Sequence, residues 1–144
     1  MNVLSQILAG STGLALISVG ILEIFFHGDQ RFHRIFLIRQ ENVHAVRMWA
    51  MNVGAYNITF GLGIAVGLWL VNFSGNPASG SAIVIFCCAC HVFLGFWLWV
   101  TEKRLLVSAI GQALFPALAI VFYVLFNYGY GDPLTDARDA DFEY

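Results

Sequence analysis

The segment from Met48 to Thr101 reads MWAMNVGAYNITFGLGIAVGLWLVNFSGNPASGSAIVIFCCACHVFLGFWLWVT. It contains no Asp, Glu, Lys or Arg. A water-soluble domain does not bury so long an uncharged segment, whereas a membrane-spanning helix needs about 20 consecutive apolar residues. Within it, Asn72–Ser81 combines Pro77 with glycines and serines, which favour a turn. The stretch therefore predicts two membrane spans.

Two further apolar segments flank this stretch. Val3–Phe26 carries one charged residue, Glu23, and Leu105–Asn127 carries none. Only 11% of the chain is charged, against about 25% in an ordinary soluble domain. We therefore predict an all-α, four-helix transmembrane bundle in one domain, residues 1–127, with spans near residues 3–26, 48–73, 82–101 and 105–127. The first span is expected to be a retained helix, and residues 128–144 an acidic tail outside the membrane.

The basic residues predict the orientation of the bundle. Six of the seven Lys and Arg residues lie in the first and third connections between spans: Arg31, Arg34, Arg39, Arg47, Lys103 and Arg104. Cytoplasmic loops of membrane proteins accumulate Lys and Arg. We therefore expect a multi-pass protein of the cell membrane with these two connections in the cytoplasm and both termini outside.

The first connection is amphipathic. Its apolar residues recur at helical spacing: Phe32, Ile35, Phe36, Val43 and Val46. Arginines and other polar residues occupy the positions between them. This pattern predicts a helical segment that lies in the membrane interface, with its arginines toward anionic lipid headgroups.

Polar side chains inside the spans are the candidates for a functional site, because hydrogen-bond partners are scarce in hydrocarbon. The set comprises Glu23, Asn52, Tyr56, Asn57, His91 and Gln112. At a rise of about 1.5 Å per residue, all of them fall in the cytoplasmic half of the predicted bundle. We predict that they converge on a polar core, with Asn52 and Tyr56 on one helix face.

Two interpretations of this polar core stay open. In the first, the amides and Tyr56 join helices by hydrogen bonds, and Glu23 pairs at the membrane rim with Arg31, Arg34 or Arg47. In the second, Glu23 binds a proton or a cation at the bottom of a small pocket or pathway.

Small residues and one proline predict how the helices pack. Gly63-x-x-x-Gly67 and Ala9-x-x-x-Gly13 allow helix backbones to approach closely. Pro116 is expected to kink the last helix and to free a main-chain carbonyl near Gln112.

The segment Cys87-Cys-Ala-Cys-His91 matches the spacing of covalent haem attachment, but it lies in the middle of a predicted span. The other histidines, His27, His33 and His44, fall at or below the predicted inner surface, and a zinc site would lack a fourth ligand. We therefore expect no cofactor and no metal, and we interpret the cysteines as small buried hydrophobic residues.

Three groups of residues resemble one family of small membrane proteins. They are Leu22-Glu23-Ile24-Phe25, Asn52-x-Gly54-x-Tyr56-Asn57 followed by Gly61 and Gly63, and Gln112-x-x-x-Pro116-Ala117. Over roughly residues 4–126 the chain is similar to the bacterial DUF1304 family. The resemblance implies a four-span fold and a polar core that includes Glu23, Asn52, Asn57 and Gln112, but it implies no reaction.

For the function, the sequence offers no nucleophile–base pair, no complete set of metal ligands and no soluble catalytic domain. We expect a non-enzymatic membrane module that contacts the lipid bilayer and packs with a membrane partner or with copies of itself, and that binds no nucleic acid. Two alternatives remain: a small oligomeric transporter that uses Glu23, and a haem- or metal-binding redox protein that uses His91 and the cysteines.

Overall fold

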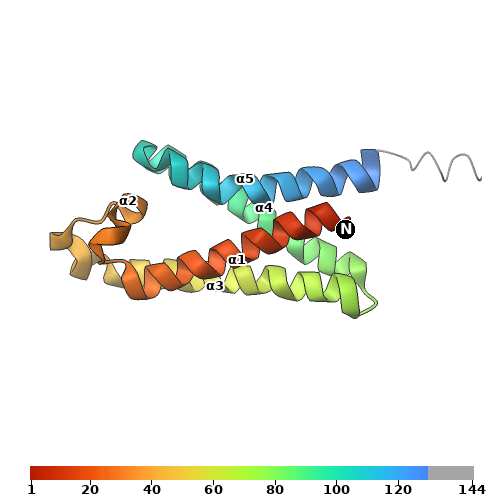
Figure 1. Cartoon of the computed structure of the whole chain (residues 1–144), viewed down its shortest axis with the longest axis horizontal. Coiled ribbons are helices and arrows are strands. Elements are labelled where there is room, and N and C mark those ends of the chain that lie inside the picture. The colour runs from red at the N-terminus through yellow and green to blue at the C-terminus, as the bar shows by residue number, and fades with distance from the viewer. Residues whose placement is uncertain (130–144) are drawn as a thin grey trace, which may run out of the picture.

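The computed structural model describes residues 1–129 and consists of helices (Figure 1). Four of the helices are long: α1 (Val3–Phe26), α3 (Val43–Phe73), α4 (Pro77–Thr101) and α5 (Leu106–Val124). Four helical segments are long and apolar enough to cross a membrane, and residues 1–129 contain no strand. The predicted all-α, four-helix transmembrane fold is confirmed. The acidic tail, apart from its first two residues, lies outside the described residues.

Two helices begin before the predicted spans, which are expected to start near residues 48 and 82. The reason is that a helix can extend beyond the part of it that crosses the membrane. α3 starts at Val43 and includes Arg47. A charged arginine is unfavourable in the hydrocarbon core of the membrane, but it does not interrupt a helix. α4 starts at Pro77, since proline is tolerated in the first turn of a helix. The Asn76 side chain caps α4 by accepting a hydrogen bond from the Ser79 backbone N–H at 3.3 Å.

The first connection does not form one amphipathic helix, so that prediction is wrong in its detail. It contains three short helical turns: η1 (Gln30–Phe32), α2 (His33–Phe36) and η2 (Gln40–Asn42). Leu37 has a φ of 53°, in the left-handed region that a right-handed helix cannot accommodate. Val43 and Val46 belong instead to the first turns of α3.

Glycines join α1 to α3. A Cβ atom built on Gly20 would lie 2.5 Å from the carbonyl oxygen of Gly54, and one built on Gly61 would lie 2.7 Å from that of Gly13. Such distances are shorter than van der Waals contact, so only glycine permits this approach of two antiparallel backbones. The two contacts are seven residues apart on each helix, so they fix both the spacing and the rotation of α1 against α3.

The remaining helix contacts also use small residues. The predicted Gly63-x-x-x-Gly67 pair faces α4, where a Cβ on Gly67 would lie 2.7 Å from Val84 and one on Gly63 would lie 3.2 Å from Cys87. Gly95 of α4 packs against the Ala109 and Ala113 region of α5, with a built Cβ 2.9 Å from each. In the Ala9-x-x-x-Gly13 pair, Ala9 is fully buried and Gly13 faces α3.

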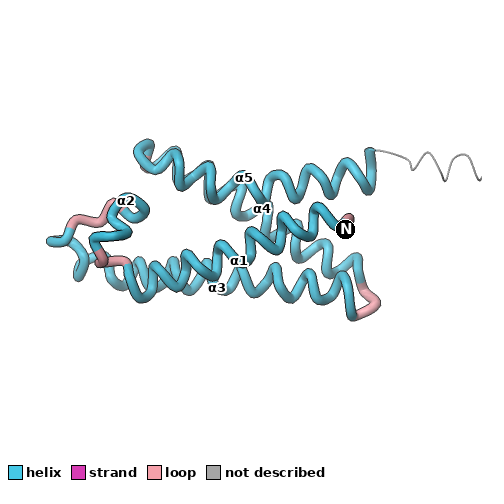
Figure 2. The backbone as a smooth tube through the Cα atoms, in the orientation of Figure 1, coloured by secondary structure: helices cyan, strands magenta, loops and turns pink. Residues whose placement is uncertain are grey.

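Hydrogen bonds join the start of α1 to the last turns of α5 at one end of the bundle. Near the start of α1, the Ser5 hydroxyl donates to the Ala119 carbonyl at 2.8 Å and the Asn2 amide donates to the Phe122 carbonyl at 2.9 Å. We call this the closed end. From there α5 diverges from α1 (Figures 1 and 2). The open end is where α1 ends at Phe26, α3 begins at Val43 and α5 begins at Leu106.

The glycine contact can be tested with a matched pair of substitutions. Gly20→Ala should destabilise the protein by about 1–3 kcal/mol, because the new methyl group collides with backbone atoms that cannot move independently. Gly111→Ala is the control, since a Cβ there meets no atom within 4 Å. It should leave stability unchanged or raise it by up to about 1 kcal/mol through helix propensity. Unfolding in detergent can be followed by a fluorogenic maleimide that reacts with the buried Cys87 and Cys88 thiols as they become exposed. Equal stability of the two variants would contradict the contact.

Candidate functional site

A pocket of about 460 Å³ lies between α1 and α5 on the open side of their hydrogen-bonded contact. α1 contributes five residues to the lining: Thr12, Ala15, Leu16, Val19 and Glu23. The first half of the last span contributes six: Leu105, Ser108, Gly111, Gln112, Phe115 and Pro116. Asn57 of α3 and Leu98 of α4 complete the walls, and Ile35 and Phe36 of α2 also line it. The pocket therefore exists because α5 diverges from α1.

Glu23 and Asn57 form the polar centre of this pocket. The Asn57 Nδ2 atom donates a hydrogen bond to Glu23 Oε2 at 2.7 Å, and both residues are half-buried. Glu23 lies three positions after Gly20, and Asn57 lies three positions after Gly54. These two glycines form the closest contact between α1 and α3. Helical side chains tilt toward the N-terminus of their helix. Because α1 and α3 are antiparallel, the Glu23 and Asn57 side chains tilt toward each other across the glycine contact.

Gln112 and Pro116 supply polar groups from the facing wall. The Gln112 side chain is half-buried and forms no hydrogen bond with any residue in the described part of the chain. Pro116 has no N–H, so the main-chain carbonyl of Gln112 lacks its usual helical donor. The pocket thus has a carboxylate with its amide partner on one side, and an unused amide and carbonyl on the other.

The pocket carries one negative group and no positive one. Glu23 is its only acidic lining residue, and the lining contains no Lys, Arg or His. The rim pairing considered for Glu23 is not formed by the described side chains, because Arg31 pairs with Asp29 at 2.6 Å and Arg47 pairs with no carboxylate. The Arg34 side chain lies outside what the structure describes. The Glu23 carboxylate therefore has a hydrogen-bond donor but no counter-charge among the described groups.

Asn52 and Tyr56 do not join this site, so the predicted convergence is wrong for them. Asn52 is exposed and donates to the Met48 carbonyl of its own helix at 2.8 Å, and Tyr56 is 64% exposed. The reason is geometric. Gly54 faces α1, and a residue two positions away is rotated by about 200° around the helix. Asn57, three positions from Gly54, turns back toward α1.

His91 lies in the protein interior but outside the pocket. It is fully buried, its Nδ1 lies 3.1 Å from the Cys87 carbonyl, and its ring packs edge-on against Phe60 at 5.0 Å between centroids. Its Nε2 atom has no hydrogen-bond partner in the described part of the chain. Cys87 and Cys88 are buried free thiols, and residues 1–129 contain no group of three or more His, Cys, Asp or Glu that could hold a metal.

Sequence reasoning did not identify the apolar walls of the pocket, although a signal for them exists. Thr12, Leu16, Val19 and Glu23 are spaced three or four residues apart, as are Leu105, Ser108, Gln112 and Phe115. Such spacing places each set on one helix face. The sequence does not tell which face of an almost uniformly apolar helix turns inward, so the two stripes are recognisable only once the packing is known.

The Glu23–Asn57 hydrogen bond predicts a pattern in a double-mutant cycle. Asn57→Leu should destabilise the protein by about 1–3 kcal/mol, because it leaves a half-buried carboxylate without its donor. Glu23→Leu combined with Asn57→Leu should be less destabilising than Asn57→Leu alone, since both polar groups are then removed. Asn52→Leu is the control on the exposed face and should change stability by less than about 0.5 kcal/mol. Additive effects of the two pocket substitutions in thermal unfolding would contradict the bond.

Comparison with known proteins gives one finding that bears on this arrangement. Residues 11–124 match the family described as "Protein of unknown function (DUF1304)". No curated protein and no solved structure matches the chain. The matched range includes Glu23, Asn57, Gln112 and the glycine contacts, in agreement with the motifs noted in the sequence. The chain belongs to the DUF1304 family.

Proposed function

We propose that the pocket between α1 and α5 binds a small organic cation with an apolar body, and that Glu23 provides the counter-charge. The observation that carries this proposal is the Glu23 carboxylate, which is the one charged group in a mainly apolar lining that contains no basic residue. A charge in such surroundings is costly unless it is paired. A ligand cation supplies the missing partner, and Asn57 orients the carboxylate toward it.

The size and the walls of the pocket agree with such a ligand. A volume of about 460 Å³ lies within the range of about 300–1,000 Å³ typical of small-molecule sites. Apolar side chains from α1, α2, α4 and α5 line it, among them Leu16, Val19 and Phe115. The unused Gln112 groups can accept a hydrogen bond from a ligand ammonium or donate one to a neutral polar group. The site therefore suits an amphipathic cation better than an inorganic ion.

We propose that this binding serves transport rather than an enzymatic reaction. Glu23 can hold either a proton or the organic cation, so exchange of one for the other would couple their movements. Neither lining hydroxyl is hydrogen-bonded to Glu23 as a nucleophile would be to its base, because the Thr12 hydroxyl donates to the Leu8 carbonyl and the bond to Glu23 comes from Asn57. Four helices enclose little space for a complete pathway, which favours an oligomer as the transporting unit.

The basic connections favour an orientation in which the open end of the bundle faces the cytoplasm. Arg31, Arg39, Arg47 and Arg104 all lie at or beyond that end. By the positive-inside rule, both termini of the chain would then be outside a cell membrane. In this orientation the pocket lies in the cytoplasmic half of the bilayer.

A second copy of the chain is the membrane partner that we propose. The Tyr56 hydroxyl is exposed on α3 and forms no hydrogen bond with a described residue, although it lies within a predicted span. A polar group at membrane depth is stabilised by a partner helix. Self-association through Tyr56 and the exposed Leu62, Val66 and Trp69, which lie farther along α3 than Met48 and Asn52, would supply such a helix without covering the α1–α5 pocket.

Binding of tetraphenylphosphonium, a lipophilic organic cation, by the purified full-length protein tests the proposed function. We expect saturable binding that Glu23→Gln weakens about tenfold or more, because the amide keeps the shape of the side chain but removes its charge. Asp29→Asn is the control, since Asp29 is an acidic residue outside the pocket that is paired with Arg31. Affinity should also fall at acidic pH, as protons compete for the carboxylate. Unchanged binding by Glu23→Gln at equilibrium would overturn the proposal.

A further inference from the structure

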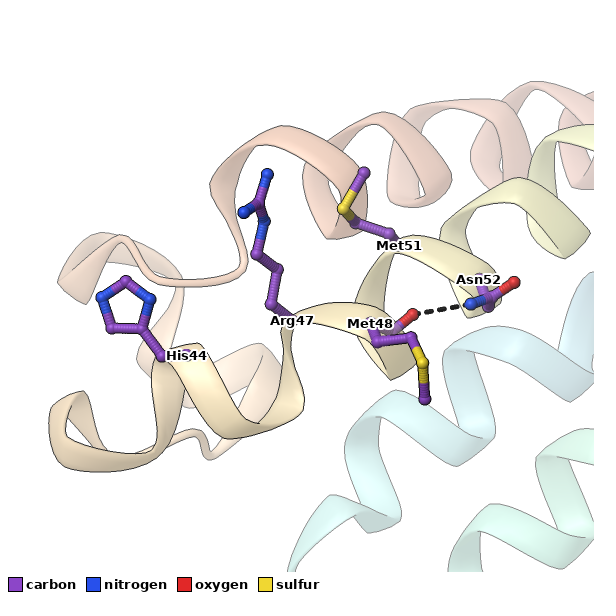
Figure 3. Close-up of a pocket in the computed structure, with 5 residues that line it drawn as sticks. All are labelled: His44, Arg47, Met48, Met51 and Asn52. Atoms are coloured by element: carbon purple, nitrogen blue, oxygen red, sulfur yellow. Dashed lines mark hydrogen bonds between the residues drawn. The ribbon is translucent and has the colours of Figure 1, made fainter.

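A second pocket lies on the surface of α3 at the open end of the bundle. It has a volume of about 630 Å³ and is lined by His44, Arg47, Met48, Met51 and Asn52 (Figure 3). It shares no lining residue with the α1–α5 pocket. Its ligand class is therefore a separate question from the proposed function.

Arg47 differs from the other arginines whose side chains the structure describes. Arg31 pairs with Asp29 at 2.6 Å, Arg39 with Glu41 at 3.5 Å and Arg104 with Glu102 at 2.7 Å. Hydrogen bonds from Arg104 lower the pKa of the Glu102 carboxyl to about 2, so that pair stays charged over the physiological range. Lys103 lies over the Trp99 ring at 3.8 Å from its centroid. Arg47 forms no ion pair or ring contact with any described side chain and faces a pocket.

The pocket changes from charged to apolar along the helix. His44 and Arg47 lie in the first turns of α3, and Figure 3 shows Met48, Met51 and Asn52 farther along the same helix. Arg47 and Asn52 are separated by about 7–8 Å along the helix axis, at about 1.5 Å per residue. A basic group at the end of a membrane helix, followed by flexible apolar side chains, matches the order of groups in a phospholipid: phosphate, glycerol esters, then acyl chains.

We propose that this pocket binds the phosphodiester of an anionic phospholipid. Arg47 donates hydrogen bonds to the phosphate oxygens, and His44 provides a further ring N–H at the same level. Met48 contacts the glycerol unit, and Met51 contacts the first methylene groups of an acyl chain. The Asn52 amide donates one hydrogen to the Met48 carbonyl at 2.8 Å, and its second amide hydrogen is available for an ester carbonyl of the lipid.

A free phosphate ion shares the same phosphate chemistry but uses only part of the pocket. It would contact Arg47 and His44 and leave the methionines and Asn52 without a role. The apolar half of the lining, and its position on a helix long and apolar enough to cross a membrane, favour the lipid as the source of the phosphate.

The experiment measures phosphatidylglycerol binding to the full chain in mild detergent, by native mass spectrometry across a lipid titration. We expect one tightly retained lipid per chain, and Arg47→Gln should weaken its binding about fivefold, which corresponds to roughly 1 kcal/mol for one basic residue at an anionic surface. Arg39→Gln is the matched control, because Arg39 is exposed in the preceding turn and pairs with Glu41. It should weaken binding less than twofold. Equal losses in the two variants would show general surface attraction and overturn the site.

Two further measurements test the site in proteins that keep Arg47, so they do not depend on the folding of the Arg47→Gln variant. Asn52→Asp removes the proposed donor to the ester carbonyl and adds a negative charge to the same pocket, so it should weaken phosphatidylglycerol binding while Arg47 is intact. A variant that binds the lipid as well as the parent would contradict the proposed contact. Inorganic phosphate at millimolar concentration should not displace the lipid. Displacement at that concentration would identify a free anion as the ligand and overturn the lipid assignment.

Discussion

The structure depends on the contact between the backbones of Gly20 and Gly54. The hydrophobic effect does not drive helices to associate within lipid. Close packing at small residues therefore has to hold a membrane bundle together. Here that contact, repeated at Gly13 and Gly61, fixes the rotation of α1 against α3. The rotation in turn decides which polar side chains of α3 face inward. Asn57 meets Glu23, whereas Asn52 and Tyr56 face outward.

The second constraint is that the hydrogen bonds between α1 and α5 lie near one end only. Ser5 and Asn2 of the first turns bond to carbonyl groups near the end of α5. Pro116 frees a carbonyl in the middle of that helix. Toward the open end of the bundle, α5 diverges from α1 (Figure 1). The α1–α5 pocket occupies the space that this divergence leaves. A closed end joined by hydrogen bonds and an open end with a carboxylate-lined pocket are therefore consequences of the same packing.

Much of the fold can be predicted from the sequence, because span length and the absence of charge identify membrane helices without knowledge of their packing. Gly63 and Gly67 were correctly expected at a close helix contact, since small residues are informative wherever they occur. The candidate site was predicted only in part. Glu23, Asn57 and Gln112 line one pocket, but a helix that is apolar on all sides gives no sign of its inward face, so Asn52 and His91 could not be placed. The first connection was misjudged because helical spacing does not reveal a single left-handed residue such as Leu37.

The central claim is that α1 and α5 meet at the closed end and separate at the open end. The most direct measurement is the distance between pairs of spin labels by pulsed electron paramagnetic resonance, in a background whose three native cysteines are replaced by alanine and whose thermal stability is retained. One pair joins exposed Val3 to Val124 at the closed end, and the other joins exposed Phe25 to Val107 at the open end. We expect a clearly longer mean distance for the open-end pair, because α5 diverges from α1 toward that end. An open-end distance equal to or shorter than the closed-end distance would contradict it.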